Sequence, residues 1–91
     1  MTRFKKETVF LVRNASGFII GGGETPENAI YEAAKEQLLT GCELLEVLLD
    51  KAYFDGELRT IKEFVQRIHK IKVTLEISSI IYTYGDSEVE I

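Results

Sequence analysis

The residues best placed to do chemistry are the glycine run Gly21-Gly22-Gly23 and the segment Glu24-Thr25-Pro26-Glu27 that follows it. An apolar strand leads into the glycines and a helix start follows at once, an arrangement that often binds phosphate on the free N–H groups of the helix. Here Pro26 removes one of those donors, and the two glutamates place negative charge where an anion would lie. The run is therefore predicted to turn a strand sharply into a helix that packs against it.

The segment from Gly23 to Ala29 resembles the middle of a Nudix box, the metal-binding loop–helix signature of nucleoside-diphosphate hydrolases. With Glu24 as the anchor, Glu32-Ala33 stands where that family has Arg-Glu, and Glu36-Gln37 stands where it has Glu-Glu. The resemblance implies one metal carboxylate, Glu36, whereas a divalent cation on phosphate needs several oxygen ligands. A degenerate Nudix-like phosphate-binding protein is thus a remote alternative.

The remaining reactive side chains have no chemical context. His69, the one histidine, lies between Arg67 and Lys70 with no nucleophile and acid marked out beside it. Cys42 is the one cysteine, which excludes an intramolecular disulfide and a cysteine zinc cluster and predicts a small buried side chain. We therefore expect no enzyme, no catalytic residue, no metal site and no cofactor.

Length and composition predict one domain spanning residues 1–91, because 91 residues with 45% hydrophobic content suffice for one compact core. The sparing use of cysteine favours a reducing compartment, and no apolar run approaches membrane-spanning length. We expect a cytoplasmic protein without a membrane partner.

The first third of the chain predicts a hairpin and a helix. Glu7 to Val12 and Phe18 to Ile20 are strand-like, and Asn14 to Gly17 supplies the turn between them. Thr25 is a suitable N-cap for a helix that starts at Pro26, and Gly41 marks its end.

Two further helices are predicted from apolar spacing. In the segment 43–54, Leu44, Leu48 and Ala52 recur at i, i+4 and i+8, although short apolar runs do not separate helix from strand well. The segment 58–71 repeats apolar residues at helical spacing and predicts the clearest amphipathic helix, and its members are Leu58, Ile61, Phe64, Val65, Ile68 and Ile71.

The end of the chain returns to strands. Residues 71–77 alternate apolar and polar side chains, residues 80–84 form or continue a strand, and residues 89–91 suit an edge strand. The predicted fold is α+β: an N-terminal β-hairpin, three helices and one or two C-terminal strands, in an antiparallel or mixed sheet covered by helices on one face.

Charge is distributed unevenly along the chain, whose net charge is −4. Residues 24–57 hold nine acids against two lysines, whereas residues 58–72 hold five bases against one acid. This alternation predicts separate acidic and basic faces.

The leading hypothesis is a small, acidic, non-catalytic interaction or regulatory module that binds a protein partner or forms a homo-oligomer. It rests on the segment 43–54, whose apolar surface exceeds what one covered side can bury. The predicted interaction residues are Leu45, Leu49, Tyr53, Glu46 and Asp50. A variant of this hypothesis is an inhibitor whose acids in residues 26–54 imitate a nucleic-acid backbone.

The alternative hypothesis is nucleic-acid binding by the basic side of the predicted helix around residues 58–70. Its cations lie opposite the apolar stripe and suit a phosphate backbone, but the face lacks interleaved aromatic residues. The residues concerned are Arg59, Lys62, Arg67 and Lys70.

Overall fold

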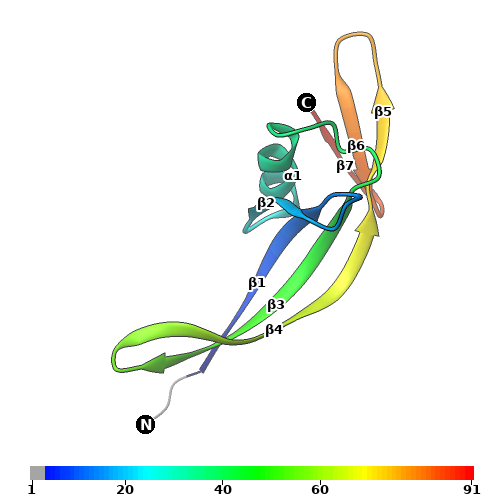
Figure 1. The fold of residues 1–91 in the computed structure, drawn as a ribbon. Coiled ribbons are helices and arrows are strands. Elements are labelled where there is room, and N and C mark those ends of the chain that lie inside the picture. Colours follow the sequence, from blue (N-terminus) through cyan, green and yellow to red (C-terminus); the bar gives the residue numbers. More distant parts are fainter. Residues whose placement is uncertain (1–3) are drawn as a thin grey trace.

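The computed structural model describes residues 4–91, which form seven strands, one helix and two antiparallel sheets (Figure 1). The elements are β1 (Phe4–Arg13), β2 (Ile19–Gly23), α1 (Pro26–Ala34), β3 (Glu43–Phe54), β4 (Glu57–Lys70), β5 (Lys72–Leu75), β6 (Ile80–Tyr84) and β7 (Ser87–Glu90). The first sheet has the order β2-β1-β3-β4, and the second has the order β5-β6-β7.

This architecture corrects the predicted fold class, because the second and third predicted helices are the strands β3 and β4. In β3 the misleading signal is the spacing of Leu44, Leu48 and Ala52. Side chains of a strand alternate between its two faces, so residues four apart share a face of a strand just as they would share a face of a helix.

In β4 the helical spacing comes from irregular pairing. Its register with β3 shifts twice, so Ile61 and Gln66 are extra residues with no direct partner. Each extra residue turns a step of two into a step of three, which places Val65 and Ile68 on the same side of the strand. Apolar residues three apart therefore resemble a helix although the backbone is extended.

The turns follow the chemistry of their residues. Asn14 Oδ1 accepts hydrogen bonds from the backbone N–H groups of Ser16 and Phe18, both at 3.0 Å, which confirms the predicted first hairpin. Asp55 and Gly56 both have positive φ, at 51° and 82°, and join β3 to β4 by a two-residue turn. Such turns match the twist of long antiparallel strands.

Helix α1 begins where the sequence predicts and ends earlier. The backbone N–H of Asn28 donates to Thr25 Oγ1 at 3.1 Å, and Pro26 is the first helical residue. The helix ends at Ala34 rather than near Gly41, whose φ of +77° instead directs the chain toward β3. In residues 4–91 no helix is long and apolar enough to cross a membrane.

The glycine run lets α1 lie directly on β2. A Cβ atom at Gly21 would be 2.5 Å from the backbone nitrogen of Ala33, and one at Gly23 would be 2.8 Å from Cβ of Asn28. Both distances are shorter than real Cβ contacts allow. The predicted architectural role of the run is confirmed.

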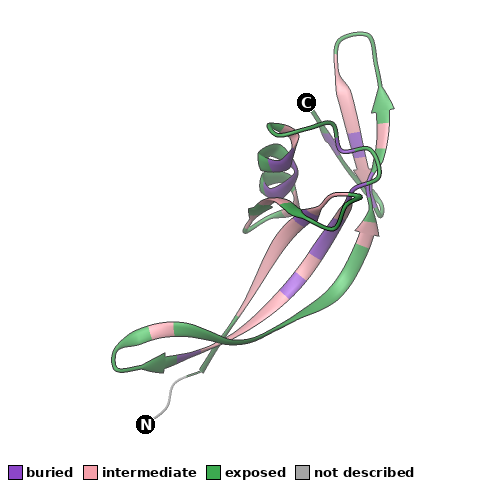
Figure 2. Ribbon diagram, viewed as in Figure 1, coloured by how far each residue is buried: buried purple, intermediate pink, exposed green. Residues whose placement is uncertain are grey.

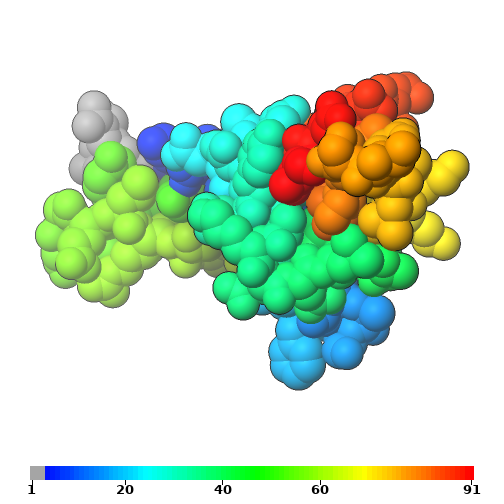
Figure 3. All heavy atoms as spheres, turned by 90° about the horizontal axis from the view of Figure 1, so that it is seen from above, coloured from blue at the N-terminus to red at the C-terminus, as the bar shows by residue number. Residues whose placement is uncertain are grey.

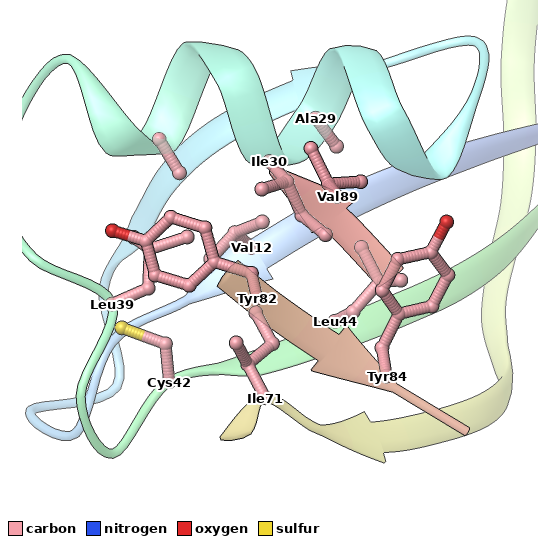
Figure 4. Packing of buried hydrophobic residues seen from close by; sticks show 11 residues of the cluster. Val12, Ala29, Ile30, Leu39, Cys42, Leu44, Ile71, Tyr82, Tyr84 and Val89 are labelled. Carbon is pink, nitrogen blue, oxygen red and sulfur yellow. The ribbon is translucent and has the colours of Figure 1, made fainter. Parts of the chain in front are cut away.

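One hydrophobic core lies at the junction of α1 and the two sheets (Figure 4). Ile30 of α1 meets Val12 and Leu44 of the first sheet, and Tyr82 and Val89 come from the second sheet. All five side chains are at most 4% exposed. The second sheet therefore closes the core that one helix alone would leave open.

The molecule is elongated, with extents of 57 × 24 × 22 Å. The core occupies one end, and the β3–β4 hairpin extends away from it as an arm that also carries the start of β1 (Figure 1). Buried residues gather in the end that holds the core, whereas β4 is exposed along nearly its whole length (Figure 2). The space-filling view shows the tip of the arm projecting from one side of the molecule (Figure 3).

Candidate protein-interaction surface

The first sheet has a second face, turned away from α1, which we call the open face. Residues directly opposite each other in an antiparallel pair share a face. Leu45 pairs with Leu11 on one side and Ile68 on the other, and neither Leu45 nor Leu11 belongs to the core cluster that contains Leu44 and Val12. The alternate residues of β1 and β3 thus form an apolar surface outside the core.

The apolar patch of the open face spans all four strands. Its members are Val9, Leu11, Ile19, Leu45, Val47, Leu49, Val65 and Ile68. In its centre Leu45 and Val47 are only 3% and 4% exposed, because neighbouring side chains surround them. Toward its two edges Ile19, Val65 and Ile68 are 51%, 45% and 53% exposed. Apolar side chains so exposed on one continuous face are typical of a binding surface.

The patch is hollowed at its centre. A depression of about 250 Å³ is lined by side chains or backbone of Leu11, Ile19, Leu45, Val47, Glu63, Phe64 and Val65. Residues of all four strands form its floor and walls. A protruding apolar side chain from another protein would fit this hollow.

Ion pairs border the patch along the strands. At one end Arg13 and Glu43 face each other across β1 and β3, with an N···O distance of 2.8 Å. At the other end Lys51 pairs with Glu7, and its hydrogen bond and charge lower the pKa of Glu7 below the ordinary value. An apolar centre with a polar border is the usual anatomy of a protein–protein interface.

The strand divides the predicted interaction residues between two faces. Leu45, Leu49 and Tyr53 alternate along the open face, whereas Glu46 and Asp50 belong to the side that carries the core. Asp50 is paired in register with Lys6 of β1 and Lys62 of β4, and its Oδ1 is shielded from solvent without a hydrogen bond in the described chain. The apolar members are brought together, and the acidic members are not part of that surface.

The predicted basic residues do not form one free face either. Arg59, Lys62 and Arg67 lie opposite Ala52, Asp50 and Glu46, whereas Lys70 lies opposite Glu43 and therefore on the open face. Acids accompany two of the cations: the ion pair of Arg59 with Glu57 measures 2.9 Å, and that of Arg67 with Glu46 measures 3.9 Å. Lys62 lies over the ring of Phe64, 5.6 Å from its centre.

The start of α1 is hydrogen-bonded to the second sheet. Tyr84 Oη donates to Glu27 Oε1 at 2.9 Å, and a hydrogen bond to its own backbone together with that from Tyr84 lowers the pKa of Glu27. Glu36 lies beyond the last helical residue and is exposed. Among residues 4–91 no group of three His, Cys, Asp or Glu side chains is arranged to hold a metal ion.

Cys42 and His69 occupy structural positions. Cys42 is 2% exposed within the core, as predicted, and burial raises the pKa of its thiol. His69 lies on β4 rather than on a helix, close to the turn at Gly85, where a Cβ atom would be 3.5 Å from its Nδ1.

Comparison with known proteins adds no constraint. No protein-family model, no curated protein and no solved structure matches this chain. The geometry of the open face therefore carries the functional argument.

The open face includes residues that sequence reasoning missed as surface residues. Their spacing in the sequence predicts that Val65 and Ile68 belong to the apolar stripe of an amphipathic helix, and Ile19 falls within the second strand of the first hairpin. The signal that identifies them is the pairing register, which requires the positions of the extra residues in β4.

Proposed function

We propose that this protein is a non-catalytic interaction module that binds a protein through the open face of its first sheet, the partner being another protein or a second copy. This proposal rests on the apolar patch, whose edge residues Ile19, Val65 and Ile68 are about half exposed. Burial of such side chains is worth about 25 cal/mol per Å² of apolar surface removed from water.

Nucleic-acid binding and the inhibitor variant have less support. The basic residues are split between two faces, and acids lie beside Arg59 and Arg67. The acids of residues 24–57 are spread over α1, β3 and the tip of the arm, so no single acidic stripe supports an inhibitor that imitates nucleic acid.

The test compares capture of protein by the immobilised full chain and by two variants, from a lysate of the cells that produce it. Ile68→Glu places a charge in the patch, and Ile77→Glu is the matched control because Ile77 is fully exposed in the bend between β5 and β6. We expect a captured protein, either another species or labelled copies of this chain, that is lost with Ile68→Glu and kept with Ile77→Glu. Equal capture by both variants would overturn the proposal.

A further inference from the structure

We infer that the occupant of the open face is a second copy of this chain, packed face to face with its strands antiparallel so that β4 lies over β4 of the copy. This inference rests on the proposed function and names its partner. The resulting homodimer would be a β-sandwich. Its twofold axis would run perpendicular to the strands, between the row of cross-strand partners that contains Leu45 and the row that contains Val47.

The first support is a charge pattern that is complementary to itself. Among the residues of β4 on the open face, the charges nearest to the patch are Glu63 at one end and Lys70 at the other. The centre of the patch on this strand lies between Val65 and Ile68, so Glu63 and Lys70 are equally distant from it along the sequence. A twofold axis through the centre would place Glu63 of each chain over Lys70 of the other.

The same relationship holds on β1. The centre of the patch there lies between Val9 and Leu11, and Glu7 and Arg13 flank it at three residues on either side. Rotation about the axis would bring Glu7 of one chain toward Arg13 of its copy, while each keeps its ion pair within its own chain. Two strands thus show the same antisymmetric order of charge about the same row, which a face built for an unrelated partner would not require.

The local charges also permit contact between identical chains although each chain carries −4. Arg13–Glu43 and Glu7–Lys51 are neutralised within the chain. Among residues 4–91, Glu63 and Lys70 form no ion pair within 4.0 Å, so they are available to a copy. Like charges brought together would cost free energy, and this arrangement avoids them.

The size of the face fits a dimer. Three strands at a spacing of about 4.8 Å, with a rise of about 3.3 Å per residue, make the face from Glu43 to Lys51 roughly 26 Å by 14 Å, and β2 widens it only opposite Phe10 to Arg13. Two such faces bury on the order of 1,000 Å² in total, which is near the lower limit for a specific interface. We therefore expect a dimer whose dissociation constant is in the micromolar range or above.

Pairing of the β4 edges is the competing way to join two copies. The extra residues Ile61 and Gln66 interrupt this edge, and charged side chains lie along it, two devices that oppose edge-to-edge pairing. The face offers no such obstruction. Ile19 separates the two arrangements experimentally, because β2 is the far strand of the sheet and only face-to-face packing would bring this residue, which lies opposite Arg13, close to Glu7 of the copy.

The test is sedimentation equilibrium of the full chain from micromolar to millimolar concentration, with circular dichroism to show that each variant is folded. We expect a mass of twice 10.3 kDa. Ile68→Glu and Ile19→Glu should each weaken the dimer at least about tenfold, while the control Ile77→Glu should leave it unchanged. A dimer that tolerates Ile19→Glu would overturn the face-to-face arrangement.

Charge reversal tests the pairing directly. Glu63→Lys and Lys70→Glu should each weaken the dimer by about tenfold, and the double variant should restore it because the complementary pairs are re-formed. Failure of the double variant to recover would overturn the antiparallel arrangement. A chain that stays monomeric at millimolar concentration would overturn the dimer, and Ile68-dependent capture of another protein would then leave the proposed function standing. Monomeric behaviour without such capture would overturn both.

Discussion

Tyr84 of β6 donates a hydrogen bond from Oη to Oε1 of Glu27 at 2.9 Å, which joins the second sheet to the first turn of α1. Tyr84 is 7% exposed and belongs to the core cluster, so one residue contributes both apolar packing and a polar contact. This contact fixes the C-terminal strands against the helix that the glycine run positions.

Tyr84→Phe is expected to keep the fold and lower the free energy of unfolding by about 1 kcal/mol, because it removes the hydrogen bond and keeps the ring. The measurement is urea denaturation followed by circular dichroism near neutral pH. Unchanged stability would show that the contact with Glu27 contributes nothing. Tyr53→Phe, at an exposed position on the arm, is the matched control.

Stability should also fall in alkaline solution through Tyr84. Burial, and then the hydrogen bond to Glu27, raises the pKa of Tyr84 to about 12 from an ordinary value of 10. Because the pKa is higher in the folded chain, this contribution is complete below pH 10 and is lost as the pH rises toward 12. The stability difference between the natural chain and Tyr84→Phe should therefore narrow across that interval. A constant difference would contradict the assignment.

Gly21→Ala should displace α1 from β2. The added Cβ atom would be 2.5 Å from the nitrogen of Ala33 and 2.8 Å from the carbonyl oxygen of Ala29, and backbone atoms cannot move aside as a side chain can. We expect a loss of about 2–3 kcal/mol or more in thermal or urea denaturation. Gly22→Ala is the control, because its nearest neighbour is a methyl group of the Leu11 side chain at 3.0 Å. Equal effects of the two changes would contradict the close packing of α1 on β2.

The arm should open independently of the core. Residues 53–57 are all exposed, so local opening there costs little free energy. In hydrogen exchange followed by NMR, we expect amides of the arm to exchange faster than those of β6. Gly56→Ala, at φ +82°, should accelerate exchange in the arm by straining the turn while leaving the amide of Tyr82 unaffected. Uniform acceleration throughout the chain would show that the arm and core unfold together.

Local chemistry made part of this structure predictable. Asn14 and Gly17 specify a turn, and Thr25 and Pro26 specify a helix start, because each acts on its own backbone within a few residues. The strand β6 has the predicted bounds 80–84, and β7 (Ser87–Glu90) overlaps the predicted edge strand 89–91, because alternation and the turn at Gly85 are local signals.

The second and third helix predictions were wrong because the spacing of their apolar residues suits both a helix and a strand. Leu44, Leu48 and Ala52 suit either a helix or a strand, and only pairing of β3 with both β1 and β4 decides between them. The candidate surface depended on the same decision. An extended β3 places Leu45 and Leu49 on one face and Glu46 and Asp50 on the other, whereas a helix would have mixed them differently.

By itself the sequence determined the turns, the helix cap, the burial of Cys42 and the apolar excess of residues 43–54, because these depend on residue type and near neighbours. Tertiary structure alone decided that the excess lies on a sheet, that Ile19, Val65 and Ile68 join it, and that Glu63 and Lys70 flank it. Those facts depend on strand pairing across many residues and on two extra residues in β4, which no local pattern specifies.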